Sequence, residues 1–385
     1  MSEVATREPQ LRFPEFSDSL IKGALGDYAL IKRGAGSQYI EYSKDSKDSI
    51  RLIRIGDFLG GDAVFVRLTN AIQRFLLDEG DILIAGTGAT AGITFLVPTK
   101  FVGMAYSYNA PKIKVHKDNV SFFYQYLISP KIKIQQIRLF TGNAQPFLDT
   151  NAIKGFSIFK PPLQEQQKIA AFLAAVDSKI EQLSKKQALL GEYKKGLMQQ
   201  IFSQAIRFKA DDGCDLPDWK EKKLGSLCEI TTGKLDANAM VKDGQYRFYT
   251  CAKEYYKIDD YAFDTDALIV SGNGANVGYI HHYQGKFNAY QRTYVLDSFT
   301  DNIVFVKFVL DGYLHKRIMK EKNEGNTPYI VMGTLTDMKI NLPSFSEQTK
   351  ISNFLSSIDN KIEQVGKQLD ESKQFKKALL QQMFV

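Results

Sequence analysis

Two copies of one segment decide the fold of this chain. PPLQEQQKIAAFLAAVDSKIEQLSKKQALLGEYKKGLMQQIF (161–202) aligns without a gap on PSFSEQTKISNFLSSIDNKIEQVGKQLDESKQFKKALLQQMF (343–384), at a constant offset of 182 residues. Of the 42 aligned positions, 19 are identical, including Glu165 with Glu347 and Asp177 with Asp359. A gapless match of this length indicates an internal duplication.

Both copies carry apolar residues in steps of three and four, which predicts a long helix with a narrow apolar stripe. At ~1.5 Å per residue, a helix of about 40 residues is roughly 60 Å long. Pro161-Pro162 and the capping-box pattern Ser344-x-x-Glu347 mark the two starts. The residues that we assign to the helix seam and to subunit docking are Ile169, Phe172, Leu173, Ile180, Leu197, Ile351, Phe354, Leu355, Ile362 and Leu379.

Two such helices in one chain hide their stripes most simply against each other. An antiparallel pair is favoured because a whole domain separates the two helices in sequence. The alternative is a pair of ordinary amphipathic core helices, but each predicted helix is far longer than the average of about 11 residues.

The segments that precede the helices are also related, although only at islands. The matching islands are Leu25-Gly26 with Leu224-Gly225, GDILIAGTGATAGITF (80–95) with TDALIVSGNGANVGYI (265–280), Ala105-Tyr106 with Ala289-Tyr290, and TGNAQPFL (141–148) with EGNTPYI (324–330). We therefore predict an α+β protein with pseudo-two-fold symmetry. Its parts are a strand-rich domain (1–160), a long helix (161–206), a second strand-rich domain (207–342) and a C-terminal long helix (343–385).

Composition narrows the class of protein. The 385 residues are 44% hydrophobic, with 50 basic and 43 acidic side chains and a net charge of +7, which excludes a disordered chain and a strongly basic tail. The start has no secretory signal, and the uncharged stretch 82–99 is broken by glycines and Pro98. Three irregularly spaced cysteines favour a reduced thiol state, and no CxxC or HxxxH pair suggests zinc. We expect a cytoplasmic protein without a membrane segment.

Each domain contains a glycine-rich loop, Gly86 to Gly92 and Gly272 to Gly278. A dinucleotide-binding loop must open a helix, whereas β-branched and aromatic residues follow the first of these loops, so nucleotide binding is disfavoured. Two interpretations remain open: a tight turn that needs positive φ, or a turn whose small polar residues approach a nucleic-acid backbone.

The segment Lys286-Phe-Asn-Ala-Tyr-Gln-Arg-Thr293 gathers side chains that match the hydrogen-bonding groups of DNA bases and phosphates. Its alternative interpretation is an exposed polar loop. The candidate DNA-binding residues are Thr87, Thr90, Tyr106, Asn109, Asn143, Gln145, Lys234, Asn273, Asn276, Lys286, Tyr290, Gln291, Arg292, Thr293 and Asn326.

Charge divides unevenly between the domains, with a net of +5 over 1–160 and −1 over 207–342. Phosphate neutralisation supplies most non-specific DNA affinity, so the second domain alone is too weakly charged for tight binding. The sequence also lacks GxxxxGK[ST], GxSxG, HExxH and the Asn/Asp-Pro-Pro-aromatic motif of amino-methyltransferases. These absences favour a recognition module over an enzyme.

Over nearly its full length the chain resembles the specificity subunit of Type I restriction-modification enzymes. The resemblance is carried by Pro161-Pro-Leu-Gln-Glu-Gln-Gln-Lys-Ile-Ala170 with its continuation to Phe202, by Glu347-Gln-x-Lys-Ile351 and by Asp359-x-Lys-Ile-Glu-Gln364, with looser support from the domain openings at Leu25-Gly-Asp27 and Trp219-Lys-x5-Gly225.

The resemblance implies a non-catalytic subunit with two target recognition domains, each reading one half of a bipartite, asymmetric sequence in double-stranded DNA. The helices would space the domains and dock two modification (methyltransferase) subunits, through which restriction (translocase and nuclease) subunits would join. S-adenosylmethionine, ATP and Mg would belong to those partners, with no cofactor or metal bound by this chain. A rival hypothesis is a non-enzymatic helical scaffold that joins protein partners without DNA readout.

Overall fold

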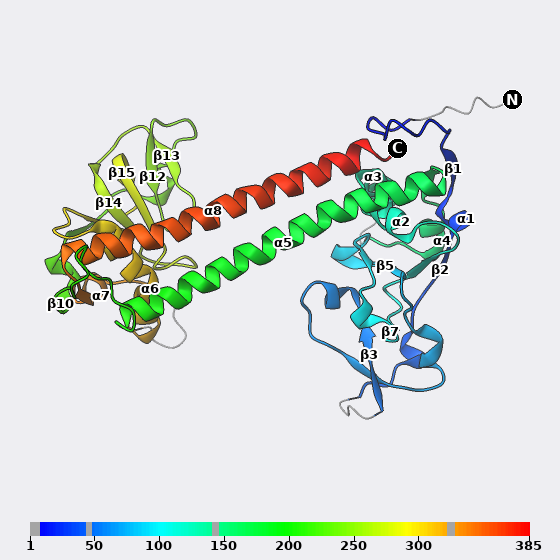
Figure 1. Ribbon diagram of the computed structural model, residues 1–385, viewed down its shortest axis with the longest axis horizontal. Helices are drawn as coiled ribbons and strands as arrows, with labels where there is room; N and C mark the ends of the chain where they lie inside the picture. Colours follow the sequence, from blue (N-terminus) through cyan, green and yellow to red (C-terminus); the bar gives the residue numbers. More distant parts are fainter. Residues whose placement is uncertain (1–7, 44–47, 141–145, 322–327) are drawn as a thin grey trace. The chain divides into compact units, whose positions relative to one another are not determined.

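The computed structural model describes residues 8–43, 48–140, 146–321 and 328–385 (Figure 1). The chain forms two compact units: unit 1 is Met1–Ser184 with Lys367–Val385, and unit 2 is Lys185–Gly366. Each unit therefore combines one strand-rich domain with part of both long helices. The predicted α+β class is confirmed, whereas the predicted four-part division of the chain stays a prediction.

The two long helices are α5 (Leu163–Phe202, 40 residues) and α8 (Phe345–Gln382, 38 residues), and each is unbroken (Figure 1). In unit 1, Lys376 Nζ lies 2.5 Å from Asp177 Oδ1; in unit 2, Lys194 Nζ lies 2.6 Å from Asp359 Oδ1. Lys194 and Lys376 are repeat equivalents, as are the two aspartates. The same pair therefore forms twice with the helices exchanged, which requires the antiparallel arrangement that the sequence predicts.

The predicted apolar stripe is the buried side of each helix. Buried members are Ile169, Leu173, Leu183 and Ile201 on α5, and Ile351, Leu355, Ile358, Val365, Leu369 and Leu379 on α8, with Met383 directly after α8. Ile180, Leu197 and Ile362 are half-buried. Phe172 and Phe354 have different neighbours from those expected for seam residues, because they pack edge-on against Phe13 and Phe208 with ring centroids 5.8 and 5.7 Å apart.

Phe13 and Phe208 belong to strap segments, which we define as residues 8–20 in unit 1 and 203–219 in unit 2. Arg12 in the first strap donates to both carboxylate oxygens of Glu165 at 2.8 and 2.7 Å. Arg207 in the second strap donates to both oxygens of Glu347 at 2.8 and 2.9 Å. Glu165 is 1% exposed and Glu347 0%, so each long helix starts with a buried carboxylate that depends on its strap for a cation.

This pairing changes the predicted capping box at the start of α8. The Glu347 N–H does approach Ser344 Oγ, at 3.4 Å. The Glu347 carboxylate, however, is engaged by Arg207 and by the indole N–H of Trp219 at 3.1 Å. The capping box is therefore half formed, because the bidentate charged partner takes the carboxylate that would otherwise reach back to the helix start.

The next residue along each helix, Gln166 or Gln348, fixes the domain to the helix. Gln166 Nε2 donates to Pro161 O and to Asp118 Oδ1, while its Oε1 accepts the Asn119 N–H at 3.0 Å. Gln348 repeats this set with Pro343, Asp301 and Asn302, at 3.0, 2.9 and 2.9 Å respectively. Asn119 and Asn302 in turn cap the helices α2 (Val120–Leu127) and α6 (Ile303–Glu321) through their side-chain oxygens.

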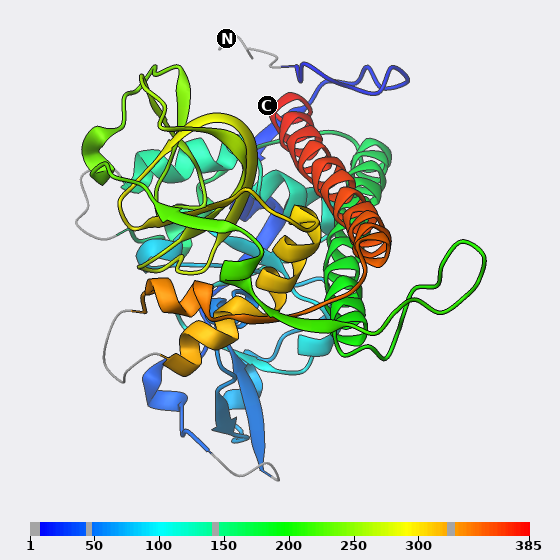
Figure 2. The same ribbon diagram turned by 90° about the vertical axis from the view of Figure 1, so that its left-hand side faces the viewer.

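Equivalent strands follow the same order in the two domains, although they form two sheets in unit 1 and one sheet in unit 2. In unit 1, β2-β8-β5-β6 and β4-β3-β7 form two sheets; in unit 2, one curled sheet has the order β11-β16-β14-β15-β12-β13 (Figure 2). The bounds in unit 1 are β2 Ala29–Lys32, β3 Ser49–Ile53, β4 Phe65–Arg67, β5 Ile82–Ile84, β6 Thr94–Leu96, β7 Ala105–Tyr106 and β8 Lys112–Val115. Those in unit 2 are β11 Glu229–Thr232, β12 Tyr246–Tyr249, β13 Tyr256–Ile258, β14 Phe263–Ser271, β15 Ile280–Ala289 and β16 Thr293–Asp297.

The single strand β15 of unit 2 pairs with both β14 and β12, whereas unit 1 divides these pairings between β6 and β7. A separate two-stranded sheet lies next to each long helix in the chain. Its strands are β1 (Ile21–Ala24) with β9 (Ser157–Lys160), and β10 (Lys220–Lys223) with β17 (Lys339–Leu342). The remaining helices are α1 Leu25–Tyr28, α3 Pro130–Phe140, α4 Thr150–Lys154 and α7 Met332–Thr336.

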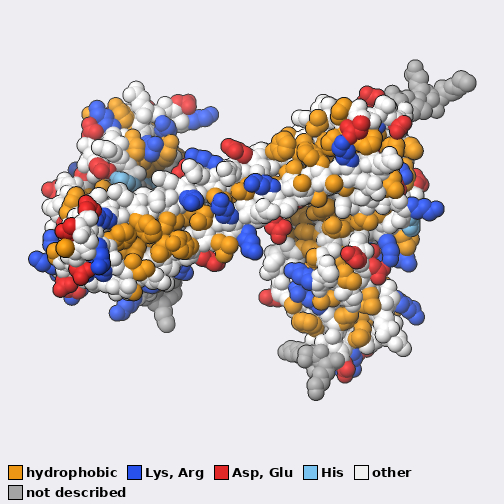
Figure 3. Space-filling view, in the orientation of Figure 1, with side chains coloured by type: hydrophobic (Ala, Val, Ile, Leu, Met, Phe, Trp, Pro, Cys, Tyr) orange, Lys and Arg blue, Asp and Glu red, His pale blue; other side chains and the backbone are white. Residues whose placement is uncertain are grey.

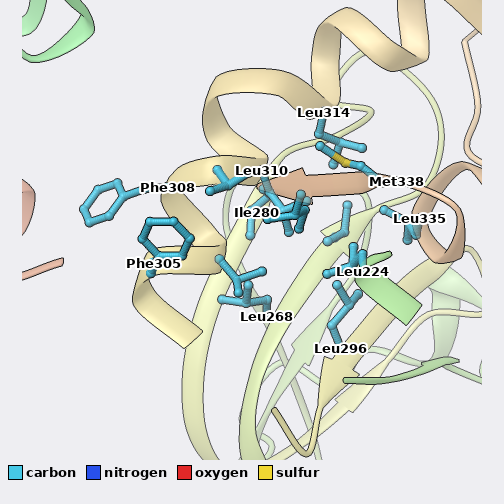
Figure 4. Close-up of a cluster of buried hydrophobic side chains, with 14 of the residues drawn as sticks. Leu224, Leu268, Ile280, Leu296, Phe305, Phe308, Leu310, Leu314, Leu335 and Met338 are labelled. Carbon is cyan, nitrogen blue, oxygen red and sulfur yellow. The ribbon is translucent and has the colours of Figure 1, made fainter. Parts of the chain in front are cut away.

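Each unit buries its long helices and its sheet in one core. In unit 2, Leu268 and Leu296 of the sheet meet Phe305, Leu310 and Leu314 of α6 (Figure 4). Ile351 and Leu355 of α8 belong to the same core. The core of unit 1 likewise joins α2 to α5 and to the end of α8, where Phe122 and Tyr126 pack against Phe384.

We predict that Arg207→Ala lowers the free energy of unfolding by about 2–4 kcal/mol, because it leaves Glu347 buried without its cation. The measurement is urea denaturation of the full chain. Lys339→Ala is the matched control, since the Lys339–Glu221 pair is more than half exposed and exposed pairs contribute at most about 1 kcal/mol. Equal effects of the two substitutions would show that the strap pair does not hold the helix start.

Candidate nucleic-acid interface

In each unit, three loops meet, and each of them resembles its counterpart in the other unit in sequence. In unit 1 the Gly86 N–H donates to Asn109 O at 2.9 Å, and Thr87 forms a β-bridge with Phe147. In unit 2 the Gly272 N–H donates to Arg292 O at 2.9 Å, and Asn273 forms a β-bridge with Tyr329. Three of the four matching islands therefore lie at one surface on each domain.

The glycine-rich loops make tight turns between antiparallel strands. Gly88 and Gly92 have φ of +77° and +87°, and Gly274 and Gly278 have +79° and +80°. These left-handed conformations favour glycine, as the tight-turn interpretation predicts. Each loop leads from strand to strand and opens no long helix, so the geometry of a dinucleotide site does not form.

Backbone hydrogen bonds fix the equivalence of the two surfaces and correct the sequence alignment by one residue. The Ser107 N–H donates to Ile53 O, and the Tyr290 N–H donates to Tyr249 O. Ser107 is therefore equivalent to Tyr290. It follows that Tyr106 corresponds to Ala289, Tyr108 to Gln291 and Asn109 to Arg292. The sequence islands had matched Tyr106 with Tyr290.

Two of the candidate DNA-binding residues, Tyr106 and Thr293, are buried. Tyr106 is 1% exposed and its hydroxyl donates to Arg33 O at 3.3 Å; burial also raises the pKa of this phenol, which stays neutral. Thr293 is 0% exposed and opens β16, with its Oγ1 4.0 Å from Cys251 Sγ. Both side chains face the protein interior, so neither is available to a ligand at the surface.

In unit 1 the loops border a groove of about 710 Å³. Thr87, Thr90 and Asn109 line it, as predicted for a shared surface, together with Gln38 and Tyr108. Tyr108 is 45% exposed, and the guanidinium of Arg33 lies 4.4 Å from the centre of its ring. Sequence reasoning missed Tyr108 because the aligned islands were one residue out of register, which placed Ser107 instead of Tyr108 opposite Gln291.

Arg54 also lines the groove of unit 1 and was not predicted. Its Nε is buried without a hydrogen-bond acceptor and lies 3.7 Å from Asp57 Oδ2, while its terminal nitrogen donates to Asp62 O at 2.7 Å. The groove therefore contains a guanidinium beside hydroxyl and amide groups. Such a donor set can contact phosphate oxygens or base edges.

Unit 2 brings together most of its candidates. The Asn276 amide donates to Cys251 O at 3.1 Å, and the Gln291 N–H donates to Leu235 O, next to Lys234. Gln291, Arg292 and Lys234 are exposed, whereas Asn273, Asn276 and Tyr290 are half-buried. These residues form a surface with amide and guanidinium groups at positions where unit 1 has threonines, Tyr108 and Asn109.

Lys286 is not joined to this surface by a contact among the described residues. It faces Asp264 across the β14–β15 pair, and its ammonium lies 4.5 Å from the centre of the Tyr261 ring. Asn143, Gln145 and Asn326 lie outside the residues that the structure describes.

The described residues contain no cluster of three or more His, Cys, Asp or Glu side chains that could hold a metal ion. Within the same residues, no helix combines the length and apolar character needed to cross a bilayer. Cys214, Cys228 and Cys251 are free thiols.

The geometry defines a duplicated α+β protein in which two related domains present different polar surfaces beside one shared pair of helices. Two stretches, 24–190 and 217–372, match the family described as Type I restriction modification DNA specificity domain. The chain belongs to this family, whose members are the non-catalytic DNA-recognition subunits of Type I restriction-modification systems.

Individual relatives agree with this assignment. The specificity subunit of the Type I restriction enzyme EcoDI of Escherichia coli is 43% identical over 168 residues, which are 42% of this chain and 37% of that protein. The MjaVIII specificity subunit of Methanocaldococcus jannaschii is 25% identical over 82% of this chain and 80% of that protein.

Solved structures share the fold. The S subunit of a Type I restriction-modification system from M. genitalium has a TM-score of 0.65 at 18% identity, with 98% of this chain and 99% of that chain covered. A chain from a study of complex assembly and conformational transition of the type I R-M system has a TM-score of 0.56, also at 18% identity, over 94% and 96% of the two chains.

We predict that Arg292→Ala weakens binding to the recognised duplex by ~1–3 kcal/mol, because an exposed guanidinium beside the glycine-rich loop can read guanine O6 and N7. Fluorescence anisotropy with the full chain assembled into its restriction-modification complex measures the change. Lys339→Ala removes one charge from the same unit as a control. A loss below ~0.3 kcal/mol would make Arg292 an ordinary solvated loop residue.

Proposed function

We propose that each unit reads one half of a bipartite, asymmetric sequence in double-stranded DNA. The long helices set the distance between the two half-sites and dock two modification subunits. Restriction subunits join through the modification subunits. S-adenosylmethionine, ATP and Mg are used by those partners, and this chain, acting in the cytoplasm, binds no cofactor or metal.

One observation carries this proposal: the supporting frame is the same twice, whereas the surfaces that it presents differ. The bidentate pairs Arg12–Glu165 and Arg207–Glu347 are repeat equivalents, as are the networks around Gln166 and Gln348. At equivalent surface positions, however, unit 1 has Asn109 where unit 2 has Arg292. Two unlike half-sites require a repeated supporting frame whose surface carries different hydrogen-bond donors and acceptors, because base identity is read by the hydrogen-bonding pattern.

Charge supports a role for the partners in DNA binding. The net charge of −1 over 207–342 gives the second strand-rich domain little general attraction to phosphates. Binding to both half-sites at physiological salt then requires positive surface from the modification subunits. Affinity without these subunits should therefore be weak.

We predict that replacing residues 1–160 with the corresponding domain of another family member changes one half of the methylated motif and leaves the other half intact. The readout is genome-wide methylation mapping in a host that carries the hybrid chain with its modification subunits. An unchanged motif would refute the assignment of unit 1 to one half-site. Loss of all methylation together with loss of the assembled complex would instead indicate a folding defect in the hybrid.

The proposed docking of two equal partners has a counterpart on the helix surface. Tyr193 of α5 and Phe375 of α8 are repeat equivalents and are 56% and 52% exposed. In unit 2, apolar atoms of Met198, Phe202 and Tyr313 line a cavity of about 480 Å³ that includes Gly191 and Lys194 of α5. Apolar side chains gather on this part of the surface in Figure 3. Exposed aromatic residues are typical anchors of protein interfaces.

We predict that Tyr193→Ala and Phe375→Ala each reduce the number of bound modification subunits from two to one at micromolar concentration, and that the double variant binds none. Native mass spectrometry of the reconstituted complex measures the stoichiometry. Tyr256→Ala, which removes a 40% exposed tyrosine from β13, is the control. Full occupancy in the double variant would place docking elsewhere.

A further inference from the structure

Two arginines occupy the same position in the two domains. Because Ile53 and Tyr249 accept equivalent backbone hydrogen bonds, Arg51 of β3 and Arg247 of β12 are equivalent, each two residues earlier. Each guanidinium also lies over an aromatic ring: that of Arg51 is 5.1 Å from the ring centre of Phe101, and that of Arg247 is 4.2 Å from the ring centre of Tyr283. The two side chains nevertheless differ in how their charge is balanced.

Arg51 is neutralised within the protein. Its Nε and terminal nitrogen donate to Asp57 Oδ1 at 3.0 and 2.6 Å, and the Asp57 side chain is 0% exposed. A buried carboxylate that accepts two bonds from one guanidinium holds that arginine in a structural role. Arg51 therefore has little charge to offer a ligand.

Arg247 has no such counterion. Its guanidinium lies between the rings of Tyr255 and Tyr283, at 4.3 and 4.2 Å from their centres, and its terminal nitrogen donates to Tyr249 Oη at 3.3 Å. Among the described residues, no carboxylate lies within 4.0 Å of it. The hydrogen bond to Tyr249 raises the pKa of Arg247, so the side chain stays charged. Two rings thus fix the plane of a half-buried, uncompensated cation.

This cation lies next to the candidate interface of unit 2. The loop after β12 connects them: Cys251 O accepts the Asn276 amide, and Cys251 Sγ lies 3.4 Å from Arg292 O. The following residue, Ala252, contacts His281 through its carbonyl at 3.1 Å, and the His281 ring packs 4.9 Å from the Tyr249 ring. Tyr255, which covers Arg247, is 42% exposed. A chain of contacts through Cys251, Ala252, His281 and Tyr249 therefore links Arg247 to the surface of Asn276 and Arg292.

We propose that Arg247 binds a backbone phosphate of the DNA that unit 2 recognises. The inference rests on the proposed function of this unit. A phosphate is favoured over a base because the tyrosines hold the side chain against the domain, which leaves its edge at the surface without the reach of an extended arginine. A fixed guanidinium edge matches two phosphate oxygens, and such contacts position a protein on the duplex without reading sequence.

The test compares Arg247→Gln, Arg247→Lys and the control Lys339→Gln in the full chain assembled with its modification subunits. Two duplexes are used, one with the motif mapped by methylation and one without it. Dissociation constants are measured by fluorescence anisotropy from 50 to 300 mM KCl. Thermal unfolding of each variant separates a loss of the contact from a loss of the fold.

We expect Arg247→Gln to weaken binding to both duplexes by about tenfold at low salt and to reduce the slope of log K against log salt by about 1. Arg247→Lys keeps the charge but loses the planar edge, so its loss should be about threefold with the slope retained. Lys339→Gln should change neither quantity.

Three outcomes would overturn the inference. Normal binding and slope in a folded Arg247→Gln variant would remove the phosphate contact. A loss confined to the motif duplex would make Arg247 a base-reading residue. A loss that follows a lowered unfolding temperature, and that Arg247→Lys reproduces in full, would make it structural. If the complex that contains the chain without substitutions fails to distinguish the two duplexes, the proposed function itself fails, whatever the variants do.

Discussion

The buried ion pair at the start of each long helix is the constraint on which the rest of the structure depends. A carboxylate as buried as Glu165 or Glu347 is tolerated only with a cation that satisfies both of its oxygens. The strap must therefore lie across the helix start. The glutamine next to each carboxylate then ties the helix to the capped start of α2 or α6. The orientation of each domain on its helix follows from this short chain of contacts.

Because the supporting contacts are repeated, change at the surface leaves the frame intact. The equivalent arginines illustrate this separation. Arg51 contributes to the stability of unit 1 through Asp57, whereas Arg247 is held by uncharged rings. One position of the fold thus serves either packing or charge presentation, depending on a single neighbouring carboxylate. The same holds for the position shared by Asn109 and Arg292, where the backbone contact is constant and the side chain is free to vary.

The long helices could be predicted because one apolar period persists over about 40 residues in two copies. The straps could not be found in this way, because Arg12 and Arg207 lie 153 and 140 residues before the glutamates that they contact. Both arginines also lie outside the two matched segments. A signal was present in Leu11-Arg12-Phe13 and Ile206-Arg207-Phe208, which share an offset of 195. One matching dipeptide, Arg-Phe, is too short to distinguish from chance without the contacts that it makes.

The surface residues were harder to predict because side-chain direction depends on strand register, which composition does not reveal. In unit 1, residues 97–104 separate two strands whose counterpart in unit 2 is one continuous strand. The aligned islands are out of register by one residue, and a shift of one residue reverses the face. Tyr106 and Thr293 carry polar groups, yet both side chains are buried. Asn109 was a candidate from the sequence, whereas Tyr108 was recognised only when Ser107 was matched to Tyr290 by its backbone bond. In this fold the hydrogen-bond partner of a strand end, more than the residue type, determines which side chains reach the surface.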